Sequence, residues 1–492
     1  MTRMTKSLAL ACGLGGLLFL SACDLTEMNV NPNQSPEPTT GFLLTDVEVN
    51  FANAYWSGFN NGRFGLLYAQ YWTQNTYTSE DRYQYRPGVV DGYWSSLYLN
   101  LNNLKEIKRL IRANPSAFES PENQIAVANI MQAYLFQVAT DIWGDIPYTE
   151  ALEGAGNRSP AYTPQAEVYP ALLDSLTQAQ AQINVEGTVP GDIIYGGDAS
   201  EWKKFANSLK MRVAMRMADR LPDVASRAIN EAIAAGPMTS VGDAATVSFL
   251  DAQPYSNPYY ENLVLDGRDD WAVSQNLVSI LQEKNDPRLP IYVAPTPASV
   301  SAGSPDYVGV RYGLAESDAP GASATTYSRP GAAVQQATSP AILMLYDEVL
   351  FIKAEAAARG FIGGDANSFF RDAVRASMRY WGVTGSVDNY VSSLPTVTAD
   401  NFRQTIGVQK WLALYMQGIQ GWSEFRRLDF TGVFVDPAGG KADQFDGRFP
   451  TRMVYPQTEG TLNAASLEAA IARQGPDTQG TLLWWDVRKI GA

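Results

Sequence analysis

The sequence predicts a mainly α-helical fold, in which tetratricopeptide-like helix-turn-helix pairs form a scaffold and a loop-rich subdomain carries short strands. Long stretches repeat apolar residues at spacings of three and four, the period of a helix that packs on one face. Such stretches recur in pairs joined by short turns, at spacings near the roughly 34-residue period of helix-turn-helix repeats. The pairs are not contiguous and show no consensus repeat, so the likeness is one of architecture.

The chain begins with a segment of the secretory-signal type. Two basic residues precede an uncharged apolar run over residues 8–20, which is shorter than the about 20 residues that a membrane-spanning helix needs. Leu-Ser-Ala-Cys at residues 20–23 then looks like a lipobox, the cleavage site of a bacterial lipoprotein. We therefore expect a signal peptide over residues 1–22, lipidation of Cys23 and an extended, proline-rich tether over residues 23–40. The alternative is an ordinary secreted protein with a chance cysteine.

The helical body is expected over residues 41–492. Gly144 and Pro147 end one helix, Ser200 caps another, and Gly236-Pro237 stops a third. The expected helices cover residues 42–56, 62–72, 92–112, 122–143, 165–183, 200–220, 223–235, 274–284, 341–359, 366–381, 401–421 and 466–473. The expected pairs are 122–143 with 165–183, 200–220 with 223–235, and 342–359 with 366–381.

The stretch over about residues 238–338 has a different composition, rich in Gly, Pro, Ser, Asp and Tyr. Within it, only residues 274–284 have the pattern of a good helix. Residues 246–250 and 307–312 are candidate strands. A loop-rich insert of this length in a compact protein is usually functional.

The composition excludes several kinds of chemistry. The chain has no histidine, which removes Ser-His-Asp and Cys-His nucleophile activation and His-ligated zinc. Its two cysteines are Cys12, inside the signal, and Cys23, so the mature body can form no disulfide. Paired carboxylates remain as a catalytic option. No cofactor is expected, although Asp, Glu and carbonyl oxygens leave a structural calcium ion open.

Charge and aromatic content indicate the kind of ligand. The net charge is -14, and loss of the signal leaves 35 basic against 51 acidic residues, or -16. Such a body should repel nucleic acid and anionic surfaces, and it suits a neutral or basic ligand. Its 25 Tyr and 11 Trp outnumber the 19 Phe, and rings with a polar group suit wet binding faces.

Eight segments along the chain carry a family resemblance. They are DLTEMNVNPN at 24–33, YAQYWTQN at 68–75, DIWGDIPY at 141–148, DPRLP at 286–290, EVLFIKAEA at 348–356, QKWLALY at 409–415, RMVYPQTE at 452–459 and WWD at 484–486. In this order, behind the lipobox, they resemble the SusD/RagB family of Bacteroidota outer-membrane lipoproteins. The resemblance covers the whole chain.

This resemblance implies four tetratricopeptide-like helix pairs and a lipid-anchored, surface-exposed protein of the outer membrane. It also implies binding of glycan, or of peptide in some members. The implied partner is a SusC-like TonB-dependent transporter, over which the lipoprotein sits as a lid while the TonB system supplies energy. Asp24 directly follows Cys23, which in enterobacteria favours inner-membrane retention, but Bacteroidota use acidic residues near the cysteine for surface export.

Two regions supply both aromatic rings and polar groups for a sugar, whose C–H faces stack on rings and whose hydroxyls bind polar side chains. They are residues 72–85, whose polar density predicts exposure, and the loop-rich insert. No family motif matches the binding residues one by one, so the candidates rest on the regions. The candidate ligand-binding residues are Trp72, Tyr77, Arg82, Tyr83, Tyr85, Tyr259, Asp270, Trp271 and Tyr327. The tryptophans expected to pack in the core are Trp143, Trp411, Trp484 and Trp485.

The sequence leaves two alternatives to glycan binding. A retaining glycoside hydrolase needs two carboxylates about 5–5.5 Å apart; Asp269 and Asp270 are adjacent and should diverge, whereas Asp141 and Asp145 belong to a family segment. With no distinguishable catalytic pair, the chain is not expected to be an enzyme. A purely structural helical-repeat scaffold for protein partners would need no aromatic loop site.

Overall fold

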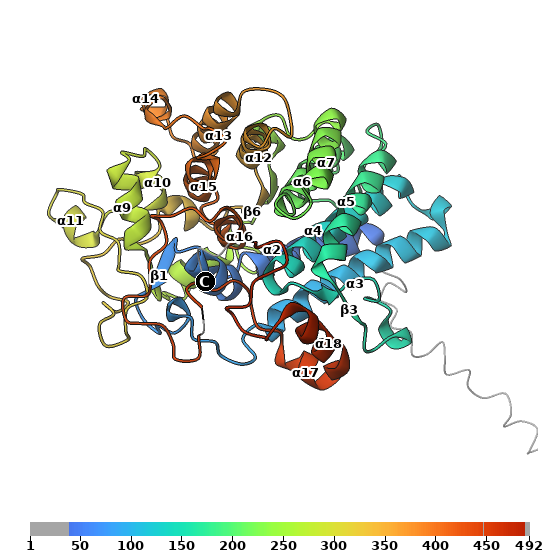
Figure 1. The fold of residues 1–492 in the computed structure, drawn as a ribbon, viewed down its shortest axis with the longest axis horizontal. Helices are drawn as coiled ribbons and strands as arrows, with labels where there is room; N and C mark the ends of the chain where they lie inside the picture. Colours follow the sequence, from blue (N-terminus) through green and yellow to red (C-terminus); the bar gives the residue numbers. More distant parts are fainter. Residues whose placement is uncertain (1–38, 446, 488–492) are drawn as a thin grey trace, which may run out of the picture. The chain divides into compact units, whose positions relative to one another are not determined.

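The computed structural model describes residues 39–445 and 447–487. The expected signal peptide, Cys23 and all but the end of the tether lie outside the described residues. Within them the fold is mainly α-helical with a few short strands, which confirms the predicted fold class (Figure 1).

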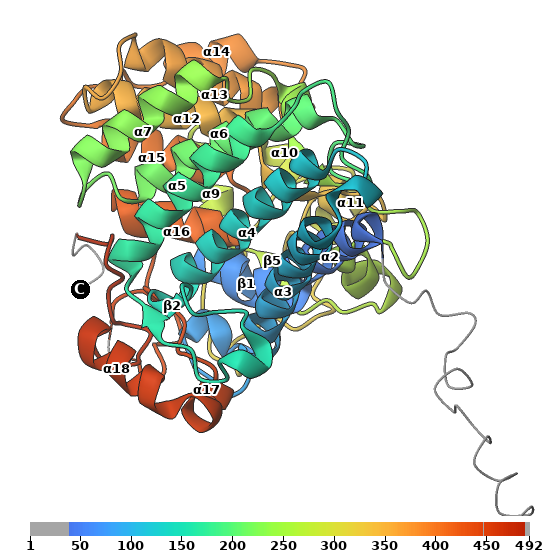
Figure 2. The same cartoon turned by 90° about the vertical axis from the view of Figure 1, so that its right-hand side faces the viewer.

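Four helix pairs pack together, and three of them are the predicted ones. The pairs are α2 (Thr40–Tyr55) with α3 (Asp91–Ala113), α4 (Pro121–Trp143) with α5 (Gln165–Gln182), α6 (Ala199–Arg216) with α7 (Pro222–Ala235), and α12 (Tyr346–Ala358) with α13 (Ala366–Tyr380). Helices α3 to α7 lie side by side in chain order (Figure 2). Helix α12 contacts α6, so the late pair joins the array despite the long insert before it.

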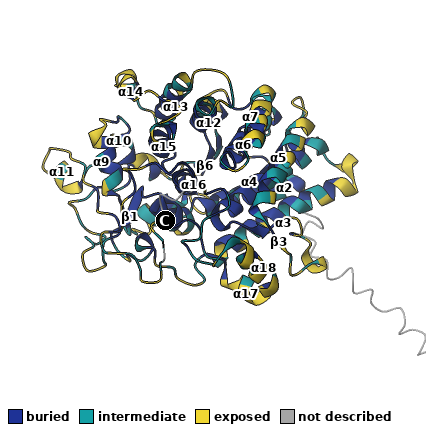
Figure 3. Ribbon diagram, viewed as in Figure 1, coloured by how far each residue is buried: buried dark blue, intermediate teal, exposed yellow. Residues whose placement is uncertain are grey.

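Helix α4 is the core helix of this array. By length and composition alone it could cross a membrane, but 89% of its most apolar stretch is buried inside the protein (Figure 3). It packs against α3, α5, α6 and α16. A helix that is apolar around most of its circumference is one that protein covers on most sides.

Three predicted helices are wrong in their bounds, two of them in the second half of the chain. Residues 341–359 begin as strand β6 (Ala341–Met344), which pairs antiparallel with β4 (Ala245–Val247), before α12 starts at Tyr346. Residues 401–421 divide into α15 (Phe402–Ala413) and α16 (Gly418–Leu428). In both cases the apolar spacing continues across the boundary, so periodicity alone gives no stop.

The break before α16 comes from close packing. Met416 has a φ of 69°, in the left-handed region, and turns the chain. A Cβ at Gly418 would collide with the carbonyl carbon of Gly65, in a π-helix over Gly58–Leu66. Only glycine lets the segments around Gly65 and Gly418 approach so closely. The predicted helix over 62–72 is wrong, because those residues begin in this π-helix and end at strand β1 (Trp72–Gln74).

The insert contains more regular structure than predicted. The expected helix is α9 (Gln275–Glu283), and the strand expected at 246–250 is β4, whereas in 307–312 only Val310 forms an isolated bridge, with Ser274. Further elements there are α8 (Pro258–Tyr260), β5 (Trp271–Val273), α10 (Leu289–Tyr292) and α11 (Pro297–Ser301). The remaining strands and α-helices of the described residues are β2 (Ile146–Pro147) paired with β3 (Tyr162–Thr163), α14 (Val387–Ser393), α17 (Gln457–Leu462) and α18 (Ala464–Gln474).

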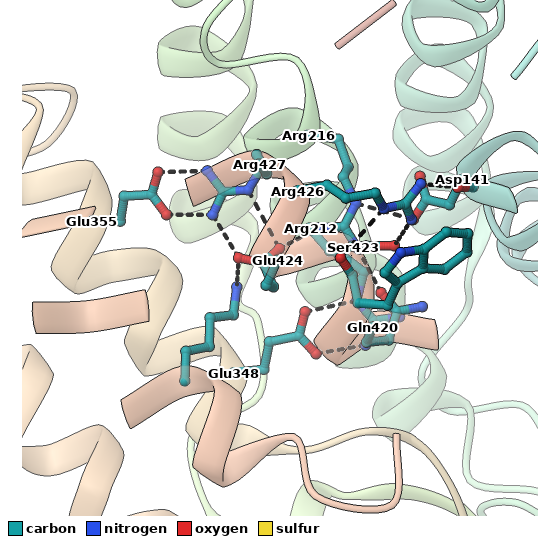
Figure 4. A network of polar contacts seen from close by, with 12 residues as sticks. Asp141, Arg212, Arg216, Glu348, Glu355, Gln420, Ser423, Glu424, Arg426 and Arg427 are labelled. Atoms are coloured by element: carbon teal, nitrogen blue, oxygen red, sulfur yellow. Dashed lines mark hydrogen bonds and ion pairs between the residues drawn. The ribbon is translucent and has the colours of Figure 1, made fainter. Parts of the chain in front are cut away.

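A buried network of ion pairs ties α16 to the helix array (Figure 4). Glu424 on α16 contacts Arg216 of α6, Lys410 of α15 and its neighbour Arg427. Arg427 also pairs with Glu355 of α12 at 2.6 Å. Each of these five side chains is at most 1% exposed. Charges this deep are stable only when paired and hydrogen-bonded, so the network specifies how these helices meet.

Candidate functional site

The pairing of β1 with β5 brings the two predicted ligand regions together. The strands are antiparallel, with Trp72 opposite Val273 and Gln74 opposite Trp271. One residue beyond the ladder, the Asn75 backbone N–H donates to the Asp270 carbonyl at 3.0 Å. Residues about two hundred positions apart in sequence therefore form one surface, and the loop after β1 lies next to the segment that precedes β5.

The loop after β1 is held by its own polar side chains. The Gln74 amide oxygen accepts from the backbone N–H groups of Glu80 and Asp81, at 3.0 and 3.2 Å. Asp81 accepts from Thr73 Oγ1 and from the Gln74 backbone, at 2.7 and 2.8 Å. Burial raises the pKa of Asp81 to about 7, although these hydrogen bonds lower it. The polarity that predicted exposure is thus used internally, and much of the loop is buried.

Glu316, from the far end of the insert, clamps the tip of this loop. Its carboxylate accepts from the backbone N–H groups of Tyr77 and Thr78, at 3.0 and 2.7 Å. The Thr78 and Tyr77 hydrogen bonds hold the pKa of Glu316 below its usual value. The clamp leaves the Tyr77 side chain 64% exposed, with its backbone in the left-handed region at a φ of 59°.

These segments enclose a pocket of about 520 Å³, which we call the Arg82 pocket. Its lining is polar and charged, with one exposed ring, Tyr77, at its edge. The lining residues are Arg63, Gln74, Tyr77, Thr78, Ser79, Glu80, Arg82, Gln84, Arg86, Arg268, Asp270, Trp271 and Glu316. A volume of this size lies within the range of small-molecule sites. The arrangement offers a ring face together with guanidinium, amide and hydroxyl groups.

Ion pairs join several of the residues that line the Arg82 pocket. Glu80, nearly buried, is shared by Arg63 at 3.3 Å and by Arg86, while Arg268 pairs with Asp270 at 2.7 Å. Burial lowers the pKa of Arg63, with Glu80 acting in the opposite direction. Arg82 donates its Nε–H to the Gly440 carbonyl at 3.0 Å.

Four of the predicted residues line the Arg82 pocket: Tyr77, Arg82, Asp270 and Trp271. Trp271 is 3% exposed, so it presents only a small part of its ring. Tyr85 and Tyr327 are half-buried and do not line this pocket.

Three predicted residues lie in the core, at 0–1% exposure: Trp72, Tyr83 and Tyr259. Trp72 meets Tyr259 edge to face at 5.3 Å and donates to the Tyr415 hydroxyl at 3.2 Å. Tyr83 packs on Phe445 at 5.0 Å. The structure corrects the expectation that residues 72–85 are exposed for Trp72 and Tyr83, and packing on other rings covers all three side chains. Trp143, Trp411 and Trp485 are buried as predicted, and Trp484 is half-buried.

The sequence reasoning did not single out several lining residues. Gln74, Glu80 and Gln84 lie inside the predicted first region, and Arg268 is two positions from Asp270, so proximity to the candidates was the available signal. Arg63 in the π-helix and Glu316 in the insert have no local signature. Only the fold brings them to the pocket.

The carboxylates that a hydrolase could have used are held by arginines. Asp269 pairs with Arg329, whereas Asp270 pairs with Arg268, so the neighbours diverge as expected. Asp141 pairs with Arg216 in the core, and Asp145 with Arg473 at 2.8 Å. In the part of the chain that the structure describes, no group of three or more Cys, Asp or Glu is arranged to hold a metal ion.

Comparison with known proteins identifies the family. Residues 32–456 match the SusD-like family, which is described as starch-binding and associating with the outer membrane. The chain belongs to the SusD-like family. No curated protein sequence matches this SusD-like chain at a significant level.

Solved structures of SusD-like proteins share this fold. A chitin-binding protein is 26% identical, with a TM-score of 0.80 over 92% of this chain and 100% of its own. A SusD-like protein from Bacteroides thetaiotaomicron is 26% identical, with a TM-score of 0.77 over 91% of this chain and 100% of its own. A chitin-binding SusD homolog from Flavobacterium johnsoniae is 23% identical, with a TM-score of 0.77 over 91% and 98%, a likeness of fold alone.

Proposed function

We propose that this SusD-like protein captures glycan at the cell surface in the Arg82 pocket and delivers it to a SusC-like TonB-dependent outer-membrane transporter. The observation that carries the proposal is the β1–β5 pairing, which joins the two predicted ligand regions into one pocket. Tyr77 offers a ring face for sugar C–H groups, and the surrounding guanidinium and amide groups suit hydroxyls. The binding of starch by the family and of chitin by a relative of similar fold supports this ligand class.

A glycan array followed by calorimetry tests the capture step. We expect Tyr77→Ala to weaken binding of the best glycan about tenfold, a loss near 1.4 kcal/mol that one stacked ring can account for. Tyr255→Ala is the matched control, since Tyr255 is 53% exposed but lines a different, apolar hollow. Equal affinity of the Tyr77→Ala variant and the wild-type protein would place the ligand elsewhere. Binding of peptides alone, in a peptide panel run alongside, would replace glycan as the ligand class.

We propose that the protein binds its ligand without chemical change. Prolonged incubation with the glycans that bind, followed by chromatography, should return them intact. Release of shorter products by pure protein would instead favour a hydrolase that uses two carboxylates.

The delivery step is tested in cells. The transporter should co-purify with this protein from outer membranes, and deletion of either gene should abolish growth on the glycan that binds. Growth that persists without the transporter would contradict delivery while leaving capture intact.

The anchor is proposed to be lipid on Cys23. Cys23→Ser should remove the lipid mass and release the protein from the outer membrane, with glycan affinity unchanged. Retention of the variant in the membrane would show that another segment holds it there.

A further inference from the structure

The charge of the Arg82 pocket opposes the charge of the whole chain. The chain has 37 basic and 51 acidic residues, and its net charge is -14. The pocket is nevertheless lined by four guanidinium groups and three carboxylates. It therefore has one positive charge in excess, on a protein that otherwise repels anions.

Each of the three carboxylates already accepts hydrogen bonds from protein groups. Glu80 accepts from the Gln74 amide at 2.8 Å and is shared by two arginines. Asp270 receives both Nε and Nη2 of Arg268, at 3.1 and 2.7 Å. Glu316 receives two backbone N–H groups. Among the described residues, no ion pair joins any of the three to Arg82.

Arg82 is the cation without a counter-charge. Its Nε–H donates to a backbone carbonyl, and among the described residues no carboxylate pairs with it. This contact fixes one edge of the guanidinium and leaves Nη1 and Nη2 without protein partners in the described part of the chain. A planar guanidinium held in this way is suited to a carboxylate, which it binds through two parallel hydrogen bonds.

We propose that the Arg82 pocket selects an acidic glycan, with Arg82 binding the carboxylate of a uronic acid residue. The inference rests on the proposed function and names its substrate class. Tyr77 covers a ring face of the same oligosaccharide, so the two contacts separate stacking from charge recognition. The preference of the whole chain for a neutral or basic ligand, which net charge alone suggests, is reversed at this pocket.

Calorimetry on the full-length protein tests this with matched ligands. The probes are tetragalacturonic acid and tetramannuronic acid, each with its methyl ester, which removes the charge and keeps the shape. We expect at least one free acid to bind tenfold or more tightly than its ester, with an advantage that shrinks as salt rises. Arg82→Gln should remove the difference between acid and ester, and Arg82→Lys should keep part of it.

The control variant is Arg220→Gln. Arg220 is exposed and donates its Nε–H to the Trp484 carbonyl at 2.6 Å, the same single contact that Arg82 makes, but it lies outside the Arg82 pocket. It should leave the preference for the acid unchanged. Thermal unfolding checks that each variant folds.

The outcomes separate the inference from the function on which it rests. Equal binding of acid and ester, equal weakening of both by Arg82→Gln, or binding of neutral glycans only would overturn acid selection and leave glycan capture standing. Binding of an acidic peptide, such as tetraglutamate, without any glycan would overturn the glycan class. Failure of every glycan on the array would refute the proposed function as well.

Discussion

Glu424→Gln is the sharpest test of what holds the helix pairs together. The Glu424 carboxylate contacts Arg216, Arg427 and Lys410, and all four side chains are at most 1% exposed (Figure 4). Glutamine keeps the shape of the side chain and removes its charge. It also replaces one acceptor oxygen with an amide donor, so the variant measures the charge together with the hydrogen bonds that this oxygen accepts.

The magnitude follows from which cations keep a partner. Arg216 retains Asp141 at 3.0 Å, and Arg427 retains Glu355 at 2.6 Å. Lys410 pairs with no other carboxylate among the described residues, so the substitution leaves a buried ammonium uncompensated. Breaking a buried pair in this way costs about 3–5 kcal/mol. That is a large part of the roughly 5–15 kcal/mol that stabilises a typical protein.

The assay is urea unfolding, followed by tryptophan fluorescence and by far-ultraviolet circular dichroism, whose agreement tests for a single transition. Glu106→Gln is the matched control, because its exposed pair with Arg109 on α3 is worth at most about 1 kcal/mol. The double variant Glu424→Gln with Lys410→Met should recover part of the loss, since it removes the unpaired ammonium. A loss for Glu424→Gln no larger than that of the control would refute the role given to the network.

The contribution of Glu424 to the free energy of unfolding should depend on pH. Burial would raise the pKa of Glu424, but Arg427, Lys410 and Arg216 outweigh it and hold the pKa well below the usual 4.5. A lowered pKa in the folded state gives stability that is fully present above 4.5 and is lost as pH falls through the lowered value. The stability difference between wild type and Glu424→Gln should therefore shrink in acid, and a constant difference would contradict this assignment.

Three further predictions follow from single residues. Gly418→Ala should destabilise the protein by about 1–3 kcal/mol, because its Cβ would collide with Gly65. The control Gly92→Ala, on helix α3 in open space, should be neutral or stabilising by up to about 1 kcal/mol. Similar urea midpoints for the two variants would contradict the close approach of Gly418 to Gly65. Burial raises the pKa of Asp347 from 3.8 to about 7, so the folded state binds an extra proton between these values and stability falls as pH rises through that range. Asp347→Asn should flatten the dependence of the free energy of unfolding on pH, and at pH 8 it should be more stable than wild type by on the order of a few kcal/mol. An unchanged dependence, measured by denaturation from pH 4 to pH 8, would disprove the titration of Asp347. Asn61→Ala should destabilise by about 1–3 kcal/mol, because Asn61 bonds the Met416 carbonyl and the Gly418 N–H in the core, and thermal unfolding that matches wild type would exclude that role.

The sequence predicted those parts of the fold that depend on neighbours within a few turns. The apolar period of α3 to α7 lies inside each segment, and the proline and glycine stops are local, so these helices were placed within a few residues. The break between α15 and α16 was missed, because Leu414 and Met416 continue the helical pattern. The contact of Gly418 with Gly65, more than three hundred residues away, decides the break.

The sequence likewise indicated only those features of the candidate site that depend on local composition. Sequence reasoning found the two regions and four pocket residues, since rings and polar groups cluster in the chain itself. It could not distinguish Tyr77, which is exposed, from Tyr83, which is buried, because both lie in one polar segment and differ only in what packs on them.

By itself, the sequence determined the helical scaffold, the family and the kind of residues available for binding. Only the tertiary structure decided which of them meet. The pairing of β1 with β5 brings Arg82 and Arg268 to one pocket, and the π-helix adds Arg63. The carboxylates that line this pocket already accept hydrogen bonds from other groups. Local charge depends on these long-range contacts, whereas net charge is a sum over the chain, and that is why a strongly acidic protein can present a cationic pocket.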